Sequence, residues 1–329
     1  MPTPTPLERL ADRLGRAARR GAPLGSVTTY RVGGPAAVMV EVRSEEELLE
    51  VRGALASSGA AGRVPVLVLG RGSNLLVADA GFPGLVVRAG GALSEVAVDA
   101  AAARGGLPVV VRAGGGAGLP VLARRTVEAG LSGLEWAVGI PGTVGGALKM
   151  NAGGHGADTA SCLVSYRWLD LCSDAGGEDA PDRLRLGYRT SALGDAEVVV
   201  SADFAARPGD PAAGRAALAE IVRWRREHQP GGSNAGSVFT NPPGDSAGRL
   251  VEVAGLKGHR LGSARVSEKH ANFIQADRTG SADDVLRLVH HVREAVAVAT
   301  GVVLRPEVKL AGFGAGARWS ESGAGEVAR

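Results

Sequence analysis

The sequence predicts a fold of the α+β class, in which short strands and capped helices follow one another along the chain. The first strand is expected over Ala37–Val42. Ser44 and the acidic residues after it then form a capping-box pattern, which starts a helix to about Ala56. The apolar run Val109–Ala113 leads through a Gly-rich segment into a helix over about Leu119–Ala129. Two strand–turn–helix units with short strands between them are typical of a mixed fold.

The other elements follow from the same signals, which are apolar runs of strand length and helices bounded by caps and glycines. Gly130 ends the helix at 119–129, and Ser281 starts a long amphipathic helix that Gly301 ends. The Pro- and Gly-rich segment Arg207–Pro211 predicts a linker. Further strands are expected at Val64–Leu69, Leu75–Val77, Leu85–Arg88, Val164–Leu171, Glu197–Ala202, His270–Gln275 and Val302–Leu310, and further helices at Ala212–Glu227 and Leu250–Ala254.

These elements divide the chain into five expected parts. Residues 1–21 form an N-terminal extension, 22–88 and 89–206 form two subdomains, and 207–312 form a C-terminal α+β domain. Residues 313–329 contain mostly Gly, Ala, Ser and charged side chains, and this composition predicts a disordered tail.

Composition excludes several classes of protein. The net charge is only +3, and the densest basic runs, Arg124-Arg125 and Arg223–Arg226, are short, so we expect no nucleic-acid partner. Two cysteines, Cys162 and Cys172, are too few for a disulfide framework or a metal–thiolate cluster, and no metal is expected. Apolar runs such as Val64–Leu69 are too short to span a bilayer, and no secretory signal is present. The chain is therefore expected to be cytoplasmic.

Three Gly-rich turns stand out in the first half of the chain, at Gly70–Asn74, Gly114–Gly118 and Gly139–Gly146. The first lacks a third glycine and precedes strand-like sequence, so it is a poor dinucleotide-binding fingerprint, and a plain β-turn is the simpler interpretation. The third lacks a Walker lysine in register. Three Gly-rich turns are still more than chain reversals alone require. Their backbone N–H groups are suited to binding the pyrophosphate of an extended cofactor.

Three distant segments carry a hydroxyl, a guanidinium and a carboxylate, at Ser237, Arg189 and Glu307. Together they would supply a proton donor and a fixed cation for a substrate carboxylate, which suits protonation of a carbon next to that carboxylate. Taken singly, Ser237 is a turn residue, Arg189 a surface arginine and Glu307 an ion-pair partner of its neighbours.

Nine short motifs in a fixed order indicate a family. From about Thr28 to Leu310 the chain resembles the UDP-N-acetylenolpyruvoylglucosamine reductases, flavoenzymes of peptidoglycan precursor synthesis. The motifs are Thr29–Gly34, Leu69–Asn74, Gly133–Glu135, Gly139–Gly142, Met150–Gly153, Gly187–Arg189, Gly236–Phe239, Lys269-His270 and Pro306–Val308. Each motif is weak alone, and their order gives the resemblance its strength.

The resemblance implies an FAD-binding fold of the vanillyl-alcohol-oxidase type in two subdomains, followed by a substrate domain. It implies non-covalent FAD, NADPH as co-substrate and a nucleotide-sugar substrate, with Ser237 as proton donor and with Arg189 and Glu307 as the other catalytic residues. The implied cofactor residues are Tyr30, Arg31, Gly70, Arg71, Gly72, Ser73, Asn74, Gly139, Ile140, Pro141, Gly145, Gly146 and Asn151. The implied substrate residues are Tyr188, Arg189, His228, Asn241 and Lys269.

Some features separate this chain from others of that kind. No tyrosine follows Tyr188, so the chain resembles the shorter branch of the family, which lacks a tyrosine-bearing lid loop. His228 stands where the family often has lysine, and Ala276 where asparagine is usual. His155 is expected to shape a tight turn near the cofactor. We expect a monomer.

Two other functions remain open from the sequence. One is a related flavin reductase or oxidase acting on another substrate, and such oxidases often tether the flavin through His or Cys. The other is a non-catalytic nucleotide-sugar binder, which the presence of Arg189, Ser237 and Glu307 together disfavours.

Overall fold

The computed structural model describes residues 3–98 and 109–314, which fall into two compact units. The first unit comprises Met1–Ala22, Ala36–Arg71 and Pro83–Glu227; the second comprises Pro23–Pro35, Gly72–Phe82 and His228–Arg329. The units interleave along the chain, because two short segments from the N-terminal third group with the C-terminal residues. The five-part division expected from the sequence stays a prediction.

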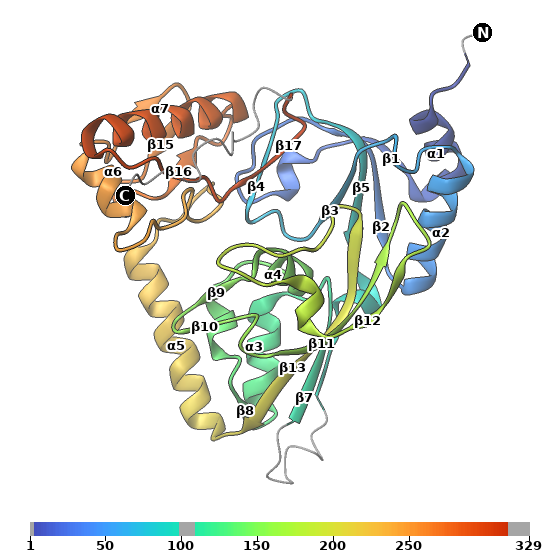
Figure 1. Cartoon of the computed structure of the whole chain (residues 1–329), viewed down its shortest axis with the longest axis horizontal. Helices are drawn as coiled ribbons and strands as arrows, with labels where there is room; N and C mark the ends of the chain where they lie inside the picture. Colours follow the sequence, from blue (N-terminus) through green and yellow to red (C-terminus); the bar gives the residue numbers. More distant parts are fainter. Residues whose placement is uncertain (1–2, 99–108, 315–329) are drawn as a thin grey trace, which may run out of the picture. The chain divides into compact units, whose positions relative to one another are not determined.

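One sheet of the first unit has the strand order β1-β2-β5-β3, with β1 and β2 antiparallel and β3 and β5 parallel. Its strands are β1 (Arg19–Ala22), β2 (Ala36–Val42), β3 (Val66–Leu69) and β5 (Phe82–Ala89). The helices α1 (Pro6–Leu14) and α2 (Glu45–Ser57) lie together beside this sheet (Figure 1). Leu10, Leu48 and Leu55 of these helices are buried in one core with Val38 and Val40.

A second sheet of the first unit has the order β12-β11-β13-β7-β6, and a short strand, β8, also pairs with β13. Its strands are β6 (Val96–Val98), β7 (Val109–Gly114), β8 (Leu131–Ser132), β11 (Leu163–Asp170), β12 (Gly176–Asp179) and β13 (Glu197–Pro208). The helices of this part are α3 (Leu119–Glu128), α4 (Val144–Met150) and α5 (Pro211–His228), and β9 (Gly153–Gly154) and β10 (Ala157–Asp158) form a small hairpin.

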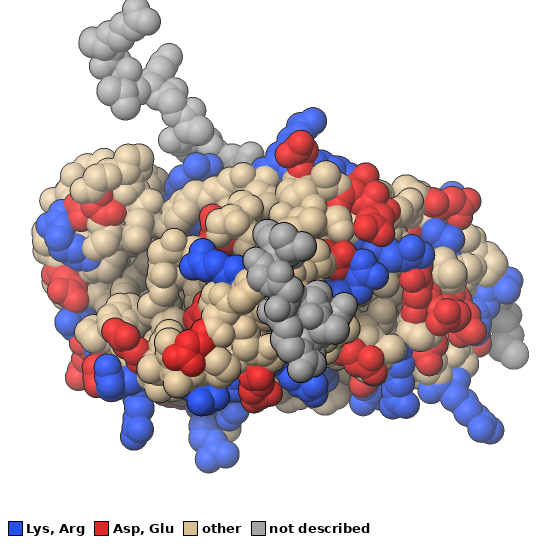
Figure 2. All heavy atoms as spheres, turned by 90° about the horizontal axis from the view of Figure 1, so that it is seen from below, with Lys and Arg blue, Asp and Glu red and all other residues tan. Residues whose placement is uncertain are grey.

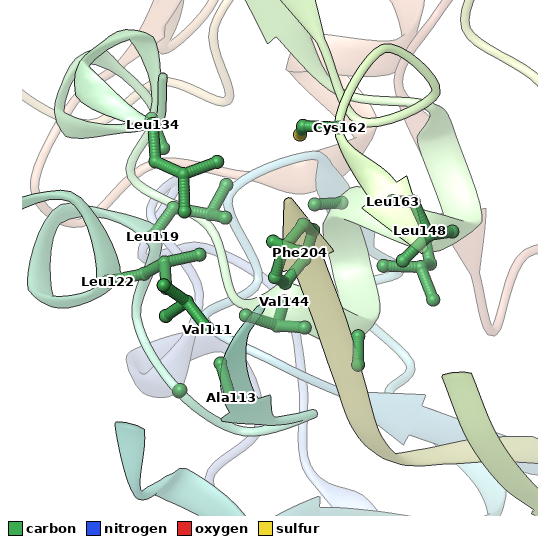
Figure 3. Packing of buried hydrophobic residues seen from close by; sticks show 14 of the residues in the cluster. Val111, Ala113, Leu119, Leu122, Leu134, Val144, Leu148, Cys162, Leu163 and Phe204 are labelled. Atoms are coloured by element: carbon green, nitrogen blue, oxygen red, sulfur yellow. The ribbon is translucent and has the colours of Figure 1, made fainter. Parts of the chain in front are cut away.

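The core beside this sheet is centred on Phe204 of β13, which is 1% exposed. Figure 3 shows its ring with Val144 of α4 beneath it, and with Leu148 and Leu163 on the opposite side from Leu119. The strand β13 lies between β11 and β7, and α4 packs against it. Residues of α3, α4 and β13 share one core, and this packing positions the Gly-rich turns that precede the two helices.

The second unit contains a three-stranded antiparallel sheet in the order β14-β15-β16 and a parallel pair, β4 and β17. Its strands are β4 (Leu75–Val77), β14 (Arg260–Leu261), β15 (Ala264–Val266), β16 (Ile274–Ala276) and β17 (Lys309–Ala311), and its helices are α6 (Ala247–Val253) and α7 (Ala282–Thr300). The two helices lie side by side (Figure 1), and α7 buries Val285, Leu288, Val292 and Val296. Tyr30 and Leu76 join this core, which explains why their segments group here.

Most predicted elements are confirmed, including both caps. Ser44 accepts a hydrogen bond from the Glu47 amide at 3.3 Å, and Ser281 accepts from the Asp283 amide at 3.1 Å. Gly130 and Gly301 follow their helices with φ of 77° and 74°, as expected for C-terminal glycines.

Other boundaries differ from the prediction. The expected linker is shorter, because Arg207 and Pro208 continue β13 and pair with β8. The expected strand at 270–275 is shorter, because the segment before β16 is a turn. The expected strand at 302–310 is reduced to β17, because Pro306 has no N–H to donate to a neighbouring strand. The helix α4 was missed, because its first residues are Val144, Gly145 and Gly146. Of the predicted tail, Phe313 packs on the core of the second unit, and residues 315–329 lie outside the described residues.

Charges of both signs alternate over most of the face shown in Figure 2. Within residues 3–98 and 109–314, every helix is too short or too polar to cross a lipid bilayer.

Asp79 caps α7 from a position 202 residues before Ser281, and its loss should loosen that helix. Its carboxylate accepts hydrogen bonds from the Ser281 hydroxyl at 2.5 Å, the Ala282 amide at 2.9 Å and the Asp283 amide at 3.1 Å. Since a lost cap costs about 1 kcal/mol, Asp79→Ala should speed amide exchange in the first turn of α7 about fivefold at pH 7. Hydrogen–deuterium exchange of peptides covering that turn measures this.

The same interaction should depend on pH. Partial burial alone raises the pKa of Asp79, but the bonds from Ser281, Ala282 and Asp283 outweigh it and lower that pKa below its usual value. The stabilisation is therefore present above the ordinary aspartate pKa of about 3.9 and is lost as pH falls through the lower folded value. The difference between the wild-type protein and Asp79→Ala should shrink below about pH 4. A difference that stays constant to pH 3 would contradict this account, and Asp210→Ala, which removes a sequence-local cap from α5, is the control that should leave α7 unchanged.

Candidate active site

The Gly-rich turns of the first unit converge. The Gly145 amide donates to the Gly115 carbonyl at 2.7 Å, and the Val144 amide donates to the Ala117 carbonyl at 2.9 Å. A Cβ placed on Gly70 would lie 2.4 Å from Oγ1 of Thr143. The turns predicted separately from the sequence therefore lie against one another, and the Thr143 side chain occupies the space that a side chain at position 70 would need.

The predicted cofactor residues of the third turn span two helix ends. Gly139 ends a 3₁₀ helix, η5 (Glu135–Gly139), Ile140 and Pro141 follow it, and Gly145 and Gly146 lie in the first turn of α4. Thr143 caps that helix by accepting from the Gly146 amide at 3.3 Å. Pro141 and Gly146 are exposed, so part of this backbone is accessible.

Helix α5 covers the Gly139 turn with residues that the sequence did not single out. Arg225 donates a hydrogen bond to the Gly139 carbonyl, and Ile221 lies 3.1 Å from where a Gly139 Cβ would stand. Trp224 packs edge-on against His155, with ring centroids 5.2 Å apart. Burial lowers the pKa of Arg225. His155, expected to shape a tight turn, has a left-handed backbone with φ of 54°.

Arg189 lies in a tight turn of the first unit. The amides of Gly187 and Thr190 each donate to the other residue's carbonyl, at 3.1 and 3.3 Å, and Arg189 between them has φ of 58°. Its guanidinium donates to the Gly153 carbonyl at 3.2 Å and lies 5.4 Å from the centroid of the Tyr188 ring. Tyr188 itself is 61% exposed.

Asn151 holds this turn in place. It is 6% exposed, and its amide nitrogen donates to the Gly187 carbonyl at 3.0 Å and to Asp158 at 3.2 Å, while its oxygen accepts from the Ala160 amide at 3.0 Å. The sequence predicted Asn151 as a cofactor residue. Its side chain is used to position the Arg189 turn, so a contact with the cofactor would fall to its backbone.

Of the other predicted cofactor residues, Arg71 ends a segment of the first unit, and Tyr30, Arg31, Gly72, Ser73 and Asn74 lie in the second. Gly72 has φ of 59°, and a Cβ there would lie 2.8 Å from the Cα of Thr28. The Thr29 amide donates to the Gly72 carbonyl at 3.2 Å. The turn that carries Gly72, Ser73 and Asn74 is thereby packed against the segment that carries Tyr30 and Arg31.

Tyr30 is fully buried in the core of this unit, and among the described residues its hydroxyl has no hydrogen-bond partner. Burial raises the pKa of Tyr30, so this hydroxyl stays protonated and is available as a donor. Arg31 is exposed and has φ of 58°.

Ser237 lies in a turn held from both sides. On the N-terminal side, the Gly236 amide donates to Oδ1 of Asn234 at 3.0 Å. On the C-terminal side, the Val238 amide donates to the Asn272 carbonyl at 2.8 Å, and the Val238 carbonyl accepts from the Glu307 amide at 2.7 Å. Phe239 and Pro306 form an antiparallel bridge next to this bond. The structure therefore brings Ser237 and Glu307 onto neighbouring segments of the second unit.

Asn74 also forms hydrogen bonds with the segment that carries Glu307. Its side chain donates to the Glu307 carbonyl at 3.2 Å, and its own carbonyl accepts from the Lys309 amide at 3.0 Å. The turn predicted to bind the cofactor is thus bonded directly to the segment predicted to carry a catalytic carboxylate. Sequence spacing gave no signal of this contact.

The remaining predicted substrate residues are exposed side chains of the second unit. His228 is the last residue of α5, and Lys269 lies in the turn before β16. Asn241 accepts a hydrogen bond from the Ala247 amide at 3.0 Å and so caps α6.

Backbone strain marks three of the predicted positions. Within the described residues, the non-glycine residues with positive φ are Arg31, Asn151, His155, Arg185 and Arg189. Arg31, Asn151 and Arg189 are among the predicted site residues, and left-handed conformations of non-glycine residues tend to cluster at functional sites.

Comparison with known protein families supports both parts of the assignment. Residues 36–173 match the FAD binding domain family, and residues 228–311 match the C-terminal domain of UDP-N-acetylenolpyruvoylglucosamine reductase. The first match contains the converging Gly-rich turns, and the second contains Ser237 and Glu307. The predicted α+β fold with an FAD-binding part, and FAD as its cofactor, are thereby confirmed.

Relatives resemble the chain over nearly its whole length. UDP-N-acetylenolpyruvoylglucosamine reductase 2 of Symbiobacterium thermophilum is 45% identical, covering 89% of this chain and 92% of the relative. The reductase of Rubrobacter xylanophilus is 43% identical, covering 92% of this chain and 97% of the relative.

A solved structure agrees with these relatives. The crystal structure of the reductase from Thermus caldophilus superposes with a TM-score of 0.74 at 36% identity, over 89% of this chain and 99% of that one. The chain therefore belongs to the UDP-N-acetylenolpyruvoylglucosamine reductase family of oxidoreductases.

Proposed function

We propose that the protein reduces the enolpyruvyl ether of UDP-N-acetylglucosamine to UDP-N-acetylmuramate, using NADPH and FAD, in peptidoglycan precursor synthesis. The observation that supports the proposal is the backbone bond between Glu307 and Val238, which joins the segments that carry Ser237 and Glu307. NADPH as electron donor rests on the family. A cytoplasmic location and a monomeric state, expected from the sequence, belong to the same proposal.

The residues present fit FAD. In the first unit, the close approach of Gly70 to Thr143 and the bond between Gly145 and Gly115 produce a surface of main chain that suits a pyrophosphate. In the second unit, the buried hydroxyl of Tyr30 has no partner among the described residues, as expected where a bound group supplies one. We assign the phosphate contacts to Gly70, Arg71, Gly145 and Gly146, and we propose that the Tyr30 hydroxyl donates a hydrogen bond to the cofactor.

A covalent link to the flavin through Cys162 is disfavoured. Burial first, with help from nearby Asp158, raises the pKa of the Cys162 thiol to about 12, so this cysteine is protonated and a poor nucleophile. This observation disfavours an oxidase that anchors its flavin through Cys162.

Ser237 is proposed to supply the proton. When bound, FAD would supply a hydride, taken from NADPH, for one carbon of the enolpyruvyl double bond. The Ser237 hydroxyl then gives its proton to the neighbouring carbon. The turn that carries Ser237 is held by the backbone amides of Gly236 and Val238, so these bonds do not use the Ser237 hydroxyl. A serine is a weak acid, and nearby cations must stabilise the oxygen that remains.

Arg189 and Glu307 are proposed to complete the chemistry. Charge develops toward the substrate carboxylate as the hydride arrives, and a guanidinium can bind such a group through two parallel hydrogen bonds. The turn around Arg189 fixes its backbone for this task. Glu307 would accept a hydrogen bond from the substrate and orient the reacting double bond. The exposed side chains of Tyr188, His228, Asn241 and Lys269 are proposed to bind the nucleotide sugar.

Anaerobic stopped-flow absorbance of the yellow holoprotein tests the proposal. NADPH should bleach the flavin, and enolpyruvyl-UDP-N-acetylglucosamine should then restore the colour quickly. Bleaching without recolouring would exclude this substrate and favour a related flavin enzyme. Flavin that stays attached to the denatured chain would contradict non-covalent binding.

A further inference from the structure

We propose that Asn272 is a positioning residue for Ser237. This inference rests on the function proposed above for Ser237, and it concerns a residue that lies outside the predicted catalytic and binding sets. Asn272 never needs to touch the substrate in this role. It acts by fixing the two residues that follow Ser237.

Asn272 makes three hydrogen bonds to this segment. Its backbone carbonyl accepts from the Val238 amide at 2.8 Å. Its side-chain oxygen accepts from the Phe239 amide at 2.9 Å, and its side-chain nitrogen donates to the Phe239 carbonyl at 2.8 Å. The side-chain amide therefore satisfies both polar groups of one peptide residue, as a neighbouring strand would.

Burial makes these bonds costly to lose. Asn272 is 3% exposed, Phe239 is 2% exposed and Val238 is 1% exposed. A buried amide or carbonyl that loses its partner costs about 1–3 kcal/mol, because water cannot replace the bond. An asparagine therefore suits this position, because an apolar residue of similar size could not make these hydrogen bonds.

The loop that carries Asn272 is itself fixed. The Asn272 amide donates to Nδ1 of His270 at 3.2 Å, and the Phe273 amide donates to the His270 carbonyl at 3.0 Å. Ser267, 1% exposed, accepts from the amides of Lys269 and His270 at 3.1 and 3.3 Å. Asn272 therefore lies in a turn that several hydrogen bonds hold, in the place where the sequence predicted a strand.

The opposite side of the Ser237 segment is bonded to the Glu307 segment through Val238 and Thr240. Asn272 and the Glu307 segment thus hold the same short stretch between them. Loss of the Asn272 side chain would free one side, and the Ser237 hydroxyl could shift relative to the carbon it protonates. A displacement of about 1 Å at a reacting group can cost about a hundredfold in rate.

Asn272→Leu is the primary test. It keeps the approximate size of the side chain but can neither accept from the Phe239 amide nor donate to the Phe239 carbonyl. In anaerobic stopped flow, we expect flavin reduction by NADPH to stay within about twofold of wild type, whereas reoxidation by enolpyruvyl-UDP-N-acetylglucosamine slows about tenfold or more. Asn272→Thr, of similar volume and with at most one of the two bonds, serves if the first variant does not yield holoprotein.

A double-mutant cycle with Ser237→Ala separates positioning from a general structural effect. If Asn272 acts through Ser237, its substitution should slow reoxidation by less than about twofold in the Ser237→Ala background. Thr240→Val is the matched control: it removes a bond from the Thr240 hydroxyl to the Arg305 carbonyl on the other side of the segment, and reoxidation should stay within about twofold.

Three results would overturn the inference: unchanged reoxidation in both Asn272 variants, equal slowing of both half-reactions, or a full additional loss in the Ser237→Ala background. A different result bears on the proposed function. If Ser237→Ala alone reoxidises at the wild-type rate, the proton-donor role of Ser237 fails, whatever the Asn272 variants do.

Discussion

Ser237→Ala is expected to slow reoxidation of the reduced flavin by enolpyruvyl-UDP-N-acetylglucosamine on the order of a hundredfold or more, and to leave flavin reduction by NADPH unchanged. The reason is that the first half-reaction needs no proton donor for a substrate carbon, whereas the second does. The alanine lacks only the hydroxyl, and the hydrogen bonds that hold the turn are made by the backbone of Gly236 and Val238, so the turn should persist.

Single-turnover absorbance at the flavin band measures both rates. Ser233→Ala, four residues earlier in the same segment, is the matched control and should behave as wild type in both half-reactions. Equal loss in the two half-reactions of Ser237→Ala would remove the proton-donor role, because it would indicate a change in flavin binding or folding instead.

Gly72→Ala is expected to impair folding of the second unit and retention of FAD. A side chain at φ of 59° is strained by about 1–2 kcal/mol, and its Cβ would stand 2.8 Å from the Cα of Thr28, a backbone atom that cannot rotate away. Relief of that overlap by backbone movement adds about 1–3 kcal/mol. The movement would displace the Tyr30 and Asn74 segments, which we propose to meet the cofactor.

Gly255→Ala separates strain from overlap. Gly255 belongs to the same unit and has φ of 71°, but nothing lies within 4 Å of its added Cβ. It should cost only the conformational term of about 1 kcal/mol and keep its flavin. Thermal unfolding monitored by the rise in flavin fluorescence compares the two variants. Equal midpoints and equal flavin content would refute the contact between Gly72 and Thr28 as the cause.

Local signals in the sequence determined the elements and the family. Caps such as Ser44 and Ser281, and terminal glycines such as Gly130 and Gly301, act over a few residues, so their effects can be predicted without the fold. The same holds for the ordered motifs, which led to the FAD-binding assignment that the family comparisons confirm. The roles of Ser237, Arg189 and Glu307 stay predictions.

The tertiary structure determined which of these separate segments contact one another. The bond from Asn74 to Glu307, the cap of α7 by Asp79 and the clamp of Asn272 on Phe239 join residues that lie tens to hundreds of positions apart. No periodicity or spacing encodes such pairs, because each depends on where independent segments end once their apolar sides are buried. The sequence alone thus determined which residues could carry the chemistry, and packing decided which buried asparagines hold them in place.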